Sequence, residues 1–480
     1  MADSAAEETR LDPSYFQDPL SVFARMREEG PVTPVTMPGG GRTWLVTRYA
    51  DVRAALADPR LYKDWANKLK ADGWVPADQA ISYLNVHMLN LDPPDHTRLR
   101  KLVVKAFTAR RVGGLRPRVE AITASLLDAM AGRDEVDLIA AFAFPLPVTV
   151  ICELIGIPAS DQDKFQAWSH AMLSSVVTPD EWRAAAYGMY EYFTAMVAAK
   201  RRSAANDLLS ALIAAQDDED SLSERELIAM LFLLLVAGHE TTVNLIASGT
   251  LALLTHPGEL ARLRADPSLL PGAVDELLRY ANPLNHATDR FTMEPVQIGG
   301  VTIPAREWVL CVTSSANHDP SRFDSPDVLD VGRDATGHLA FGHGIHYCLG
   351  APLARLEGEV AFGALLSRFP DLSLAVPASS LRWRRSSLIH GLESLPVRLA
   401  PLPVRRNRPD PLLRGRRGSR QLSAGAGNAL ALQNLKVQGL LGPDGSLDRE
   451  KRLPLAHWSG KDRLTSQRDT LPGYLISEIS

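Results

Sequence analysis

Three scarcities narrow the possibilities for this chain of 480 residues. Its three cysteines, Cys152, Cys311 and Cys348, are widely spaced, so they do not suggest a disulfide framework, and we expect a reducing compartment. The formal net charge is only −4, so the overall charge gives no indication of nucleic-acid binding. The first ten residues are polar and acidic and lack the apolar segment of a signal peptide, so we expect a cytoplasmic protein.

Long hydrophobic runs are also scarce. The longest, from Leu227 to Gly238, has about twelve residues, whereas a membrane-spanning helix needs about 20. His239 and Glu240 follow it at once. The run therefore fits a buried core helix better than a membrane span, and we expect a soluble protein. We also expect the protein to be a monomer. With 45% hydrophobic and 22% charged residues, the composition is ordinary for a globular protein.

The patterning predicts a mainly α fold with small β-sheets. Ser223 and Glu226 form a capping box. The helix that it opens continues without a breaker to Thr255, which gives a length of roughly 48 Å at ~1.5 Å per residue. This helix is apolar nearly all round and is expected to be buried. Residues 285–313 are strand-like, with a hairpin over 297–303 around two glycines.

The sequence predicts three segments. Residues 1–11 are expected to be a disordered N-terminus, and residues 12–399 to form one domain. Residues 400–480 are rich in Arg, Gly and Pro with little periodicity, which predicts a disordered C-terminal extension. Inside the domain, residues 61–91 have weak periodicity and are expected to form a long, partly ordered loop, a kind of segment that is often functional.

The glycine-rich loop around Cys348 is the most informative stretch. Gly342, Gly344 and Gly350 accept backbone angles that other residues cannot, and they let other groups approach the main chain. A helical pattern starts at Ala351, so Cys348 should lie just before a helix N-terminus, where backbone N–H groups favour a thiolate. Such a thiolate could be a metal ligand or a nucleophile, and the cysteine could also be a simple buried sulfur.

The centre of the long predicted helix carries polar residues that are unusual in an apolar environment. Ala237 and Gly238 are followed within four residues by Glu240, Thr241 and Thr242. Burying a carboxylate and two hydroxyls without partners is costly. In the simplest interpretation, the threonines only bond back to carbonyl groups of the preceding turn and bend the helix.

Together these patterns resemble the cytochrome P-450 family of haem-thiolate monooxygenases, and most closely its soluble actinobacterial members that oxidise macrolides, other polyketides and sterol-like compounds. The resemblance covers roughly residues 12–399. Four motifs occur in the family's order: His-x-x-x-Arg, the acid–threonine pattern of the long helix, Glu-x-x-Arg, and Phe-Gly-x-Gly-x-His-x-Cys-x-Gly. The residues that match them are His96 and Arg100; Ala237, Gly238, His239, Glu240, Thr241 and Thr242; Glu276 and Arg279; and Phe341, Gly342, Gly344, His346, Cys348 and Gly350.

The resemblance implies a haem b cofactor with Cys348 as its axial thiolate ligand, which pushes electron density to the iron. It also implies that charge-assisted hydrogen bonds hold the two haem propionates. The implied partners of the propionates are His96, Arg100, Arg290 and His346, and Phe341, Gly342 and Gly350 complete the cofactor-binding set. Without the family context, His96 and Arg100 would be interpreted as part of a solvated helix face.

The same resemblance gives the helix centre a catalytic role. The small residues Ala237 and Gly238 would leave room for dioxygen, and Glu240 and Thr241, with the neighbouring Thr242, would relay protons to it.

A structural role is implied for the pair formed by Glu276 and Arg279, which the family buries to anchor the segment before the cysteine. The additional basic partner of this pair is not clear from the sequence, and Arg333 and His343 are the candidates.

A lipophilic substrate is expected in an apolar pocket. Its predicted wall consists of the loop over residues 70–90 and of Leu233, Val236, Leu284, Asn285, His286, Leu388 and Ile389. The chain has no flavin or iron–sulfur pattern, so electrons are expected from a separate ferredoxin or flavodoxin and an NAD(P)H reductase. An acidic partner of this kind would dock on the basic face near Arg98, Lys101, Lys105 and Arg110, although any one of these residues could equally be ordinary solvated surface.

Three alternative functions stay open at this point. The chain could be a catalytically silent recruitment module that keeps the fold, but such a module would be expected to lose the thiolate or the Glu240–Thr241 pair. A peroxide-driven enzyme would also be expected to lose this acid–alcohol pair. Finally, His343, His346 and Cys348 could form a zinc site or a Cys–His nucleophile.

Overall fold

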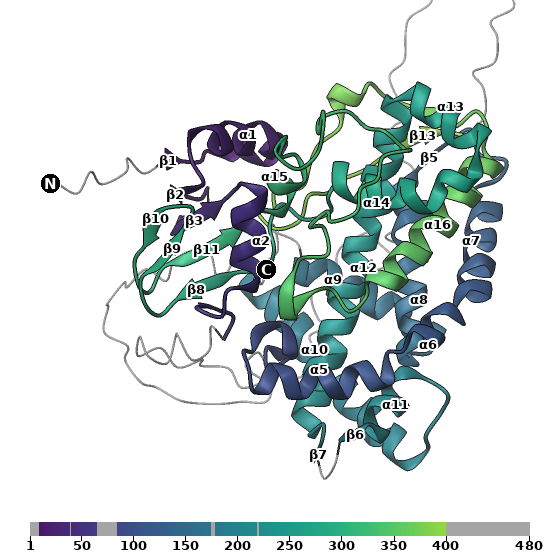
Figure 1. Ribbon diagram of the computed structural model, residues 1–480. Coiled ribbons are helices and arrows are strands. Elements are labelled where there is room, and N and C mark those ends of the chain that lie inside the picture. Colours follow the sequence, from purple (N-terminus) through teal and green to yellow (C-terminus); the bar gives the residue numbers. More distant parts are fainter. Residues whose placement is uncertain (1–8, 39, 65–83, 174–177, 218–219, 400–480) are drawn as a thin grey trace, which may run out of the picture. The chain divides into compact units, whose positions relative to one another are not determined.

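The computed structural model describes residues 9–38, 40–64, 84–173, 178–217 and 220–399. This part of the chain is mainly helical with small β-sheets, which confirms the predicted fold class (Figure 1). The α-helices are α1 (Pro19–Glu29), α2 (Tyr49–Ala57), α5 (Asp95–Ala106), α6 (Ala109–Gly113), α7 (Arg116–Met130), α8 (Pro145–Ile155), α9 (Gln162–Leu173), α10 (Pro179–Arg202), α11 (Leu208–Ala214), α12 (Glu224–Thr255), α13 (Pro257–Ala265), α14 (Leu270–Tyr280), α15 (Thr313–Asn317) and α16 (Ala351–Arg368).

The strands are short and form small sheets. They are β1 (Thr9–Arg10), β2 (Val32–Thr36), β3 (Arg42–Val46), β4 (Leu61–Tyr62), β5 (Glu135–Asp137), β6 (Gln216–Asp217), β7 (Asp220–Ser221), β8 (Arg290–Thr292), β9 (Val296–Ile298), β10 (Val301–Ile303), β11 (Trp308–Cys311), β12 (Ser373–Leu374) and β13 (Pro396–Arg398). Figure 1 shows β2, β3, β8 and β11 beside α1 and α2, while the long helices lie together on the other side.

The largest sheet has the order β1-β2-β3-β11-β8-β4, so it joins the start of the chain to the segment just before the Cys348 loop. Strand β11 pairs with β3 in parallel and with β8 in antiparallel orientation. Strands β9 and β10 form the predicted hairpin, and the two residues between them, Gly299 and Gly300, have φ angles of 55° and 85°. Glycine adopts such angles without strain.

One predicted boundary is wrong. Thr9 pairs with Val35 across β1 and β2, and Leu11 is buried, so residues 9–11 belong to the ordered domain rather than to a disordered N-terminus. The predictions for residues 1–8 and 400–480 lie outside the described residues, as does most of the loop predicted over residues 61–91.

Helix α12 begins and ends where the sequence predicts. The N–H of Glu226 donates to the Ser223 hydroxyl at 3.3 Å, and the N–H of Ser223 donates to the Glu226 carboxylate at 2.8 Å, which completes the capping box. By length and composition this helix could also cross a membrane, but 61% of its most apolar 18-residue window is buried inside the domain. Burial of this kind is typical of a core helix.

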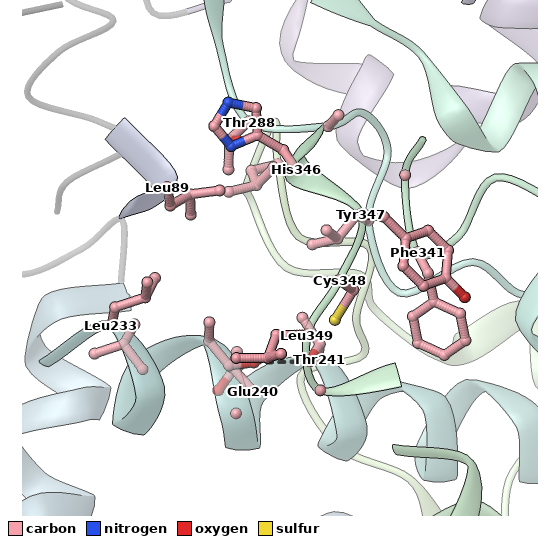
Figure 2. Close-up of a pocket in the computed structure, with 18 of the residues that line it drawn as sticks. Leu89, Leu233, Glu240, Thr241, Thr288, Phe341, His346, Tyr347, Cys348 and Leu349 are labelled. Carbon is pink, nitrogen blue, oxygen red and sulfur yellow. Dashed lines mark hydrogen bonds between the residues drawn. The ribbon is translucent and has the colours of Figure 1, made fainter. Parts of the chain in front are cut away.

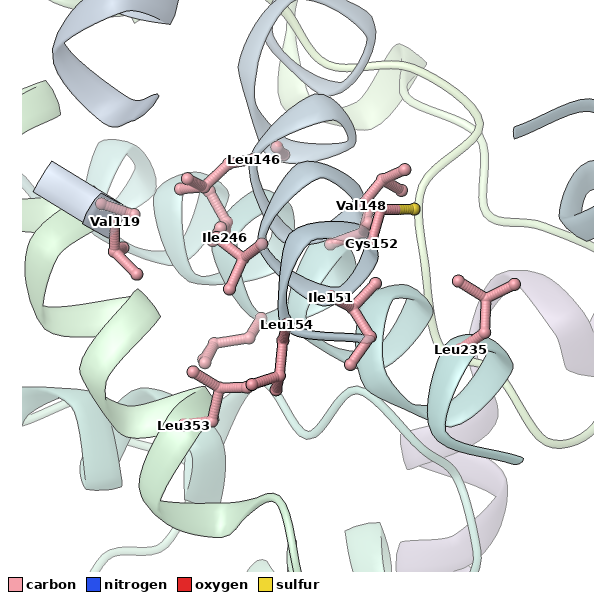
Figure 3. Packing of buried hydrophobic residues seen from close by; sticks show 14 of the residues in the cluster. Val119, Leu146, Val148, Ile151, Cys152, Leu154, Leu235, Ile246 and Leu353 are labelled. Atoms are coloured by element: carbon pink, nitrogen blue, oxygen red, sulfur yellow. The ribbon is translucent and has the colours of Figure 1, made fainter. Parts of the chain in front are cut away.

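The main hydrophobic core lies where α7, α8, α12 and α16 meet (Figure 3). The contributing side chains include Val119 of α7, Ile151 of α8, Ile246 of α12 and Leu353 of α16, and all of them are buried. These helices carry or adjoin the segments that line the predicted site, so the core fixes the distance between α12 and the start of α16.

Helices α12 and α16 approach each other closely at Gly249. A Cβ atom at this position would lie 2.6 Å from Cζ of Phe362, a fully buried ring that would have to shift. Glycine is required here by packing, because a contact of this length is far inside the normal separation of carbon atoms.

The pair predicted on α14 is fully buried. Glu276 accepts hydrogen bonds from Nε and Nη2 of Arg279 at 2.6 and 2.8 Å, which is the bidentate geometry of a strong pair. Arg279 also donates to the carbonyl oxygen of Asn317 at 2.9 Å. Nε of Arg333 donates to Glu276 at 3.2 Å, so Arg333 rather than His343 is the additional basic partner.

We expect Gly249→Ala to destabilise the protein by about 1–3 kcal/mol, because an extra methyl group must fit into a packed core. Gly258→Ala in α13 is the matched control, since its Cβ would meet nothing within 4 Å and alanine favours the helix by up to ~1 kcal/mol. Thermal unfolding midpoints of the two purified variants and the wild type would be compared. Equal midpoints for the two variants would contradict the packing argument.

Candidate active site

A cavity of about 470 Å³ lies between α12, the segment before β8 and the loop that carries Cys348. Most of the residues predicted for the site line it. They are His96, Arg100, Leu233, Val236, Ala237, Gly238, Glu240, Thr241, Thr242, Leu284, Arg290, Phe341, Gly342, His346, Cys348, Gly350, Leu388 and Ile389. Figure 2 shows the sulfur of Cys348 directed toward α12, where Glu240 and Thr241 lie. The fold therefore brings all four motifs close together, three of them in the wall of this cavity.

The Cys348 loop is shaped by glycines and by one closing hydrogen bond. Gly342 and Gly344 have φ angles of 72° and 77°, a left-handed conformation that strains other residues. A Cβ on Gly344 would lie 3.0 Å from the carbonyl oxygen of Leu56, so the loop also passes close to α2. The N–H of Cys348 donates to the carbonyl oxygen of Phe341 at 2.9 Å and closes the loop.

Helix α16 begins directly after the loop, at Ala351, as predicted, but its N-terminus does not by itself make Cys348 a thiolate. Burial raises the pKa of Cys348, and it outweighs the N–H groups of Gly350 and Ala351 and the charges of Arg100 and Arg355, which lower this pKa. The N–H groups at the helix start do favour the thiolate, as expected, but in the polypeptide alone burial outweighs them. A metal cation at the sulfur would supply the missing stabilisation.

Two imidazole rings of the cavity lie against each other. The ring centroids of His96 and His346 are 4.3 Å apart. Neither ring nitrogen of His96 has a hydrogen-bond partner in the described part of the chain, and Nε2 of His346 has none there either. Burial, together with the charges of Lys63 and other basic neighbours, lowers the pKa of His346 to about 2. Buried nitrogens of this kind are costly unless a ligand pairs with them.

Two arginines add donors to the same wall. Nη2 of Arg100 donates to the carbonyl oxygen of Tyr347 at 2.6 Å, and Nη1 of Arg290 donates to that of Thr288 at 3.2 Å. A guanidinium group has five N–H donors, so these carbonyl bonds leave donors for an anion in the cavity.

Lys63, which no sequence motif includes, lies just after β4 and lines the same cavity. Its buried Nζ donates to Oγ1 of Thr288 at 2.5 Å and to the carbonyl oxygen of Asp289 at 3.0 Å. Burial and the neighbouring charge of Arg290 lower the pKa of Lys63 to about 7. Little in the sequence indicates a role for this residue, because it belongs to no motif and a single lysine is usually exposed.

The carboxylate of Glu240 is bridged to a distant part of the chain. Arg384, from the segment between α16 and β13, forms an ion pair with its Oε1, and Nδ2 of Asn244 donates to the same oxygen at 3.4 Å. Nε2 of His239 lies 3.9 Å from the other carboxylate oxygen. The buried charge of Glu240 is therefore paired, as buried charges generally must be.

The turn before Glu240 serves packing as well as the cavity. The hydroxyl of Thr241 donates to the carbonyl oxygen of Ala237 at 2.9 Å, which is the local bond of the simplest interpretation, although Thr241 also lines the cavity. A Cβ on Gly238 would lie 3.1 Å from Cδ1 of Ile151 in α8. Close contact between α8 and α12 thus explains this glycine at least as well as room for dioxygen does.

Two residues predicted for the pocket wall are not in it. Asn285 donates from Nδ2 to the carbonyl oxygen of Ser387 at 2.9 Å, and Nδ1 of His286 lies 2.8 Å from the carbonyl oxygen of Ala287. Both side chains are buried beside the cavity rather than lining it. They are engaged with the backbone that supports the wall.

The predicted basic docking face is smaller than expected. Arg98 of α5 forms an ion pair with Glu226 and lies 3.3 Å from a carboxylate oxygen of Asp220. Its charge is thus already compensated by α12 and β7. Lys101 and Lys105 remain on the exposed side of α5.

Comparison with known proteins identifies the family. A family model described as Cytochrome P450 matches residues 182–374. Cytochrome P450 107B1 of Saccharopolyspora erythraea is 53% identical over 399 residues, which are 81% of this chain and 96% of that protein. The chain belongs to the cytochrome P450 family. The polyketide biosynthesis cytochrome P450 PksS of Bacillus subtilis is 42% identical over 392 residues, which cover 80% of this chain and 97% of that one.

Solved structures agree with this assignment. The P450 monooxygenase TamI with bound tirandamycin C is 50% identical and has a TM-score of 0.76, with 82% of this chain and 100% of that chain covered. This cytochrome P450 is accordingly a haem-containing monooxygenase, an oxidoreductase that incorporates oxygen from O2.

The residues of the cavity fit haem b, the cofactor of a cytochrome P450. The two propionates of haem b are carboxylates, and the cavity wall holds buried imidazole nitrogens without partners, two guanidinium groups and the ammonium of Lys63. Charge-assisted hydrogen bonds to carboxylates are the strongest that such groups make. The alternative zinc site at His343, His346 and Cys348 is not supported, because no cluster of metal-ligating side chains occurs in the part of the chain that the structure describes.

A buried carboxyl group on α16, Glu357, was also missed by the sequence patterns. It is 1% exposed, and its Oε2 has no hydrogen-bond partner among the described residues. Burial raises the pKa of Glu357 from 4.5 to about 8. Between these two pH values the folded protein keeps a proton that the unfolded chain releases, so this group lowers stability progressively as pH rises.

We therefore expect Glu357→Gln to gain stability relative to the wild type as pH rises from 5 to 8.5, because the variant has no acid to ionise. The effect should be a few kcal/mol at most. Glu359→Gln, two positions along the same helix and in an ion pair with Arg116 at 2.5 Å, is the control and should show no such rise. Thermal midpoints measured across this pH range would decide, and a constant difference for Glu357→Gln would refute the prediction.

Proposed function

We propose that this cytochrome P450 inserts one atom of O2 into a large hydrophobic polyketide, macrolides included, with electrons from a separate ferredoxin or flavodoxin and an NAD(P)H reductase. The observation that carries the hydrophobic character of the substrate is the apolar part of the cavity wall, formed by Leu233, Val236, Leu284, Leu388 and Ile389. The names of the relatives agree with it, since PksS is named for polyketide biosynthesis and TamI was solved with tirandamycin C. Terpenoid and sterol-like molecules would meet the same wall and serve as the competing substrates in the test.

In this proposal Cys348 would hold the haem iron through its sulfur, and the bound haem would supply the chemistry that activates O2. The proposed propionate partners are His96, Arg100, Arg290 and His346, and we add Lys63 because its ammonium lies in the same wall. Phe341, Gly342 and Gly350 keep the loop in the shape that presents the sulfur.

Glu240, Thr241 and Thr242 are proposed to deliver the protons that oxygen reduction requires. The hydroxyl of Thr241 donates to a carbonyl of its own helix, which leaves its oxygen lone pairs free to accept a hydrogen bond from a group in the cavity. Glu240 is paired with Arg384, whose side chain is 27% exposed, so the pair connects the buried carboxylate with solvent.

The redox partner is proposed to dock on the exposed face of α5 and α6, at Lys101, Lys105 and Arg110, without a contribution from Arg98. The exposed Val104 lies among these residues, and basic side chains around a small apolar centre suit an acidic electron carrier. A cytoplasmic, monomeric protein remains part of this proposal. The retained Glu240–Thr241 pair argues against a peroxide-driven or catalytically silent relative.

The test combines one spectrum with one binding screen. The reduced, CO-bound protein should show the red-shifted Soret band of a thiolate-ligated haem, Cys348→Ser should lose it, and Cys152→Ala, a buried cysteine of α8, should keep it. The ferric protein should then show substrate-induced Soret shifts with macrolides and linear polyketides at lower concentrations than with terpenes, steroids or fatty acids.

A colourless protein after expression with added haem would refute the cofactor assignment. Tightest binding of a steroid or fatty acid, with no shift by any polyketide, would refute the substrate class and leave the cofactor assignment in place.

Thr241→Ala should uncouple the reaction: NADPH consumption continues, hydrogen peroxide accumulates and product falls at least tenfold, because a hydroxyl that orders proton delivery is lost where oxygen is reduced. Thr250→Ala is the matched control. Its hydroxyl makes the same type of bond, to the carbonyl oxygen of Ile246 at 2.7 Å, on the same helix but not in the cavity wall. The ratio of product to NADPH would be measured for both variants. If Thr241→Ala couples as well as the wild type, the proton-delivery role is wrong.

A further inference from the structure

One carboxylate ties together the two ends of the Cys348 loop. Oδ1 of Asp275, on α14, accepts a hydrogen bond from Nε of Arg355 at 2.7 Å and lies 3.2 Å from Nε2 of His338. His338 precedes the loop, and Arg355 follows it on the first turns of α16. Asp275 is adjacent to the structural pair residue Glu276, but its partners are different, so the motif does not account for it.

The hydrogen bonds fix the protonation state of His338. The N–H of Ala340 donates to Nδ1 of His338 at 3.2 Å, so this nitrogen carries no proton. Nε2 must then carry the proton of the neutral ring, and it is the donor to Asp275. Asp275 thus keeps its full negative charge, and the neighbouring Arg355 compensates it.

Arg355 is the link from this carboxylate to the sulfur. Its guanidinium carbon lies 4.6 Å from the ring centroid of Phe341, a distance at which a cation is attracted to the ring face. The carbonyl oxygen of Phe341 accepts the N–H of Cys348. Arg355 also donates a hydrogen bond to the side chain of Tyr347, the residue directly before Cys348.

We propose that Asp275 and Arg355 are positioning residues that set the electrostatic environment of Cys348 and, through it, the reduction potential of the haem. Arg355 stabilises negative charge on the sulfur, and Asp275 attenuates this effect while holding the guanidinium in place. Groups just outside a metal's ligands commonly tune the metal in this way. The inference rests on Cys348 being the haem ligand proposed above.

Removing the two charges should shift the reduction potential in opposite directions. This distinguishes an electrostatic effect from a general disturbance of the structure. Asp275→Asn removes a negative charge near the sulfur, so the reduced haem is stabilised and the reduction potential rises. Arg355→Gln removes a positive charge, so the potential falls. A tenfold change in the one-electron equilibrium, or ~59 mV, is the size expected for each. Arg355→Lys keeps the charge and should restore most of the wild-type potential.

The potentials would be measured by dithionite titration of the full-length holoprotein, followed at the Soret band. Arg368→Gln, which removes a positive charge from the far end of the same helix, where it pairs with Asp128 at 3.2 Å, is the control and should leave the potential unchanged. The proposal would be overturned if the reduction potentials of Asp275→Asn and Arg355→Gln shifted in the same direction, or if neither potential shifted.

The outcomes also separate this proposal from the one on which it rests. A wild-type protein without the thiolate CO spectrum would refute Cys348 as the ligand. A normal wild-type spectrum with unaltered potentials in the variants would refute only the role of Asp275 and Arg355. If Arg355→Gln fails to retain haem, Asp275→Asn and Arg355→Lys still test the proposal. Asp275→Asn must raise the reduction potential, and Arg355→Lys must leave it near the wild-type value.

Discussion

Buried positive charge is the constraint on which the rest of this site depends. Lys63, Arg100 and Arg290 share one cavity wall with the imidazoles of His96 and His346. The hydrogen bonds of the three cations go to backbone carbonyl groups and one hydroxyl. Mutual repulsion and burial lower the pKa of Lys63 to about 7 and that of His346 to about 2. An anionic ligand would stabilise such a cluster, and the two propionates of haem b are anions of this kind.

The opposite requirement applies at Cys348, where negative charge must be stabilised. Burial alone keeps the thiol protonated, and the N–H groups at the start of α16 only partly offset it. The iron of the haem and the charge of Arg355 complete the compensation in our interpretation. One cofactor thus satisfies both sides of the cavity, because it brings carboxylates to the basic wall and a metal cation to the sulfur.

Close helix packing fixes the position of the basic wall of the cavity relative to Cys348. Gly249 lets α12 approach the ring of Phe362 on α16, and Gly238 lets α12 approach Ile151 on α8. The acid of the proposed proton path is then reached by Arg384 from the end of the domain. A glycine in the middle of a helix destabilises that helix. At these two positions, close packing between helices therefore outweighs the loss of local helix stability.

Much of this site could be predicted because local patterns carry it. The ends of α12, the β9–β10 hairpin and the loop around Cys348 follow from caps, breakers and glycines that act on their sequence neighbours. The residues that were missed, Lys63, Arg384 and Asp275, act on partners far away in the chain, and no local pattern marks such pairs. Arg98 is a similar case, since no local pattern indicates its ion pair with Glu226 of α12.

The order of the residues was therefore enough for the fold class and, through the resemblance of its short motifs to the cytochrome P-450 family, for the family, the cofactor and the cysteine that we propose as its ligand. Which charges compensate one another was decided only by the tertiary structure. Electrostatic interactions depend on distance in space and on burial, and both arise only when helices from different parts of the chain pack together.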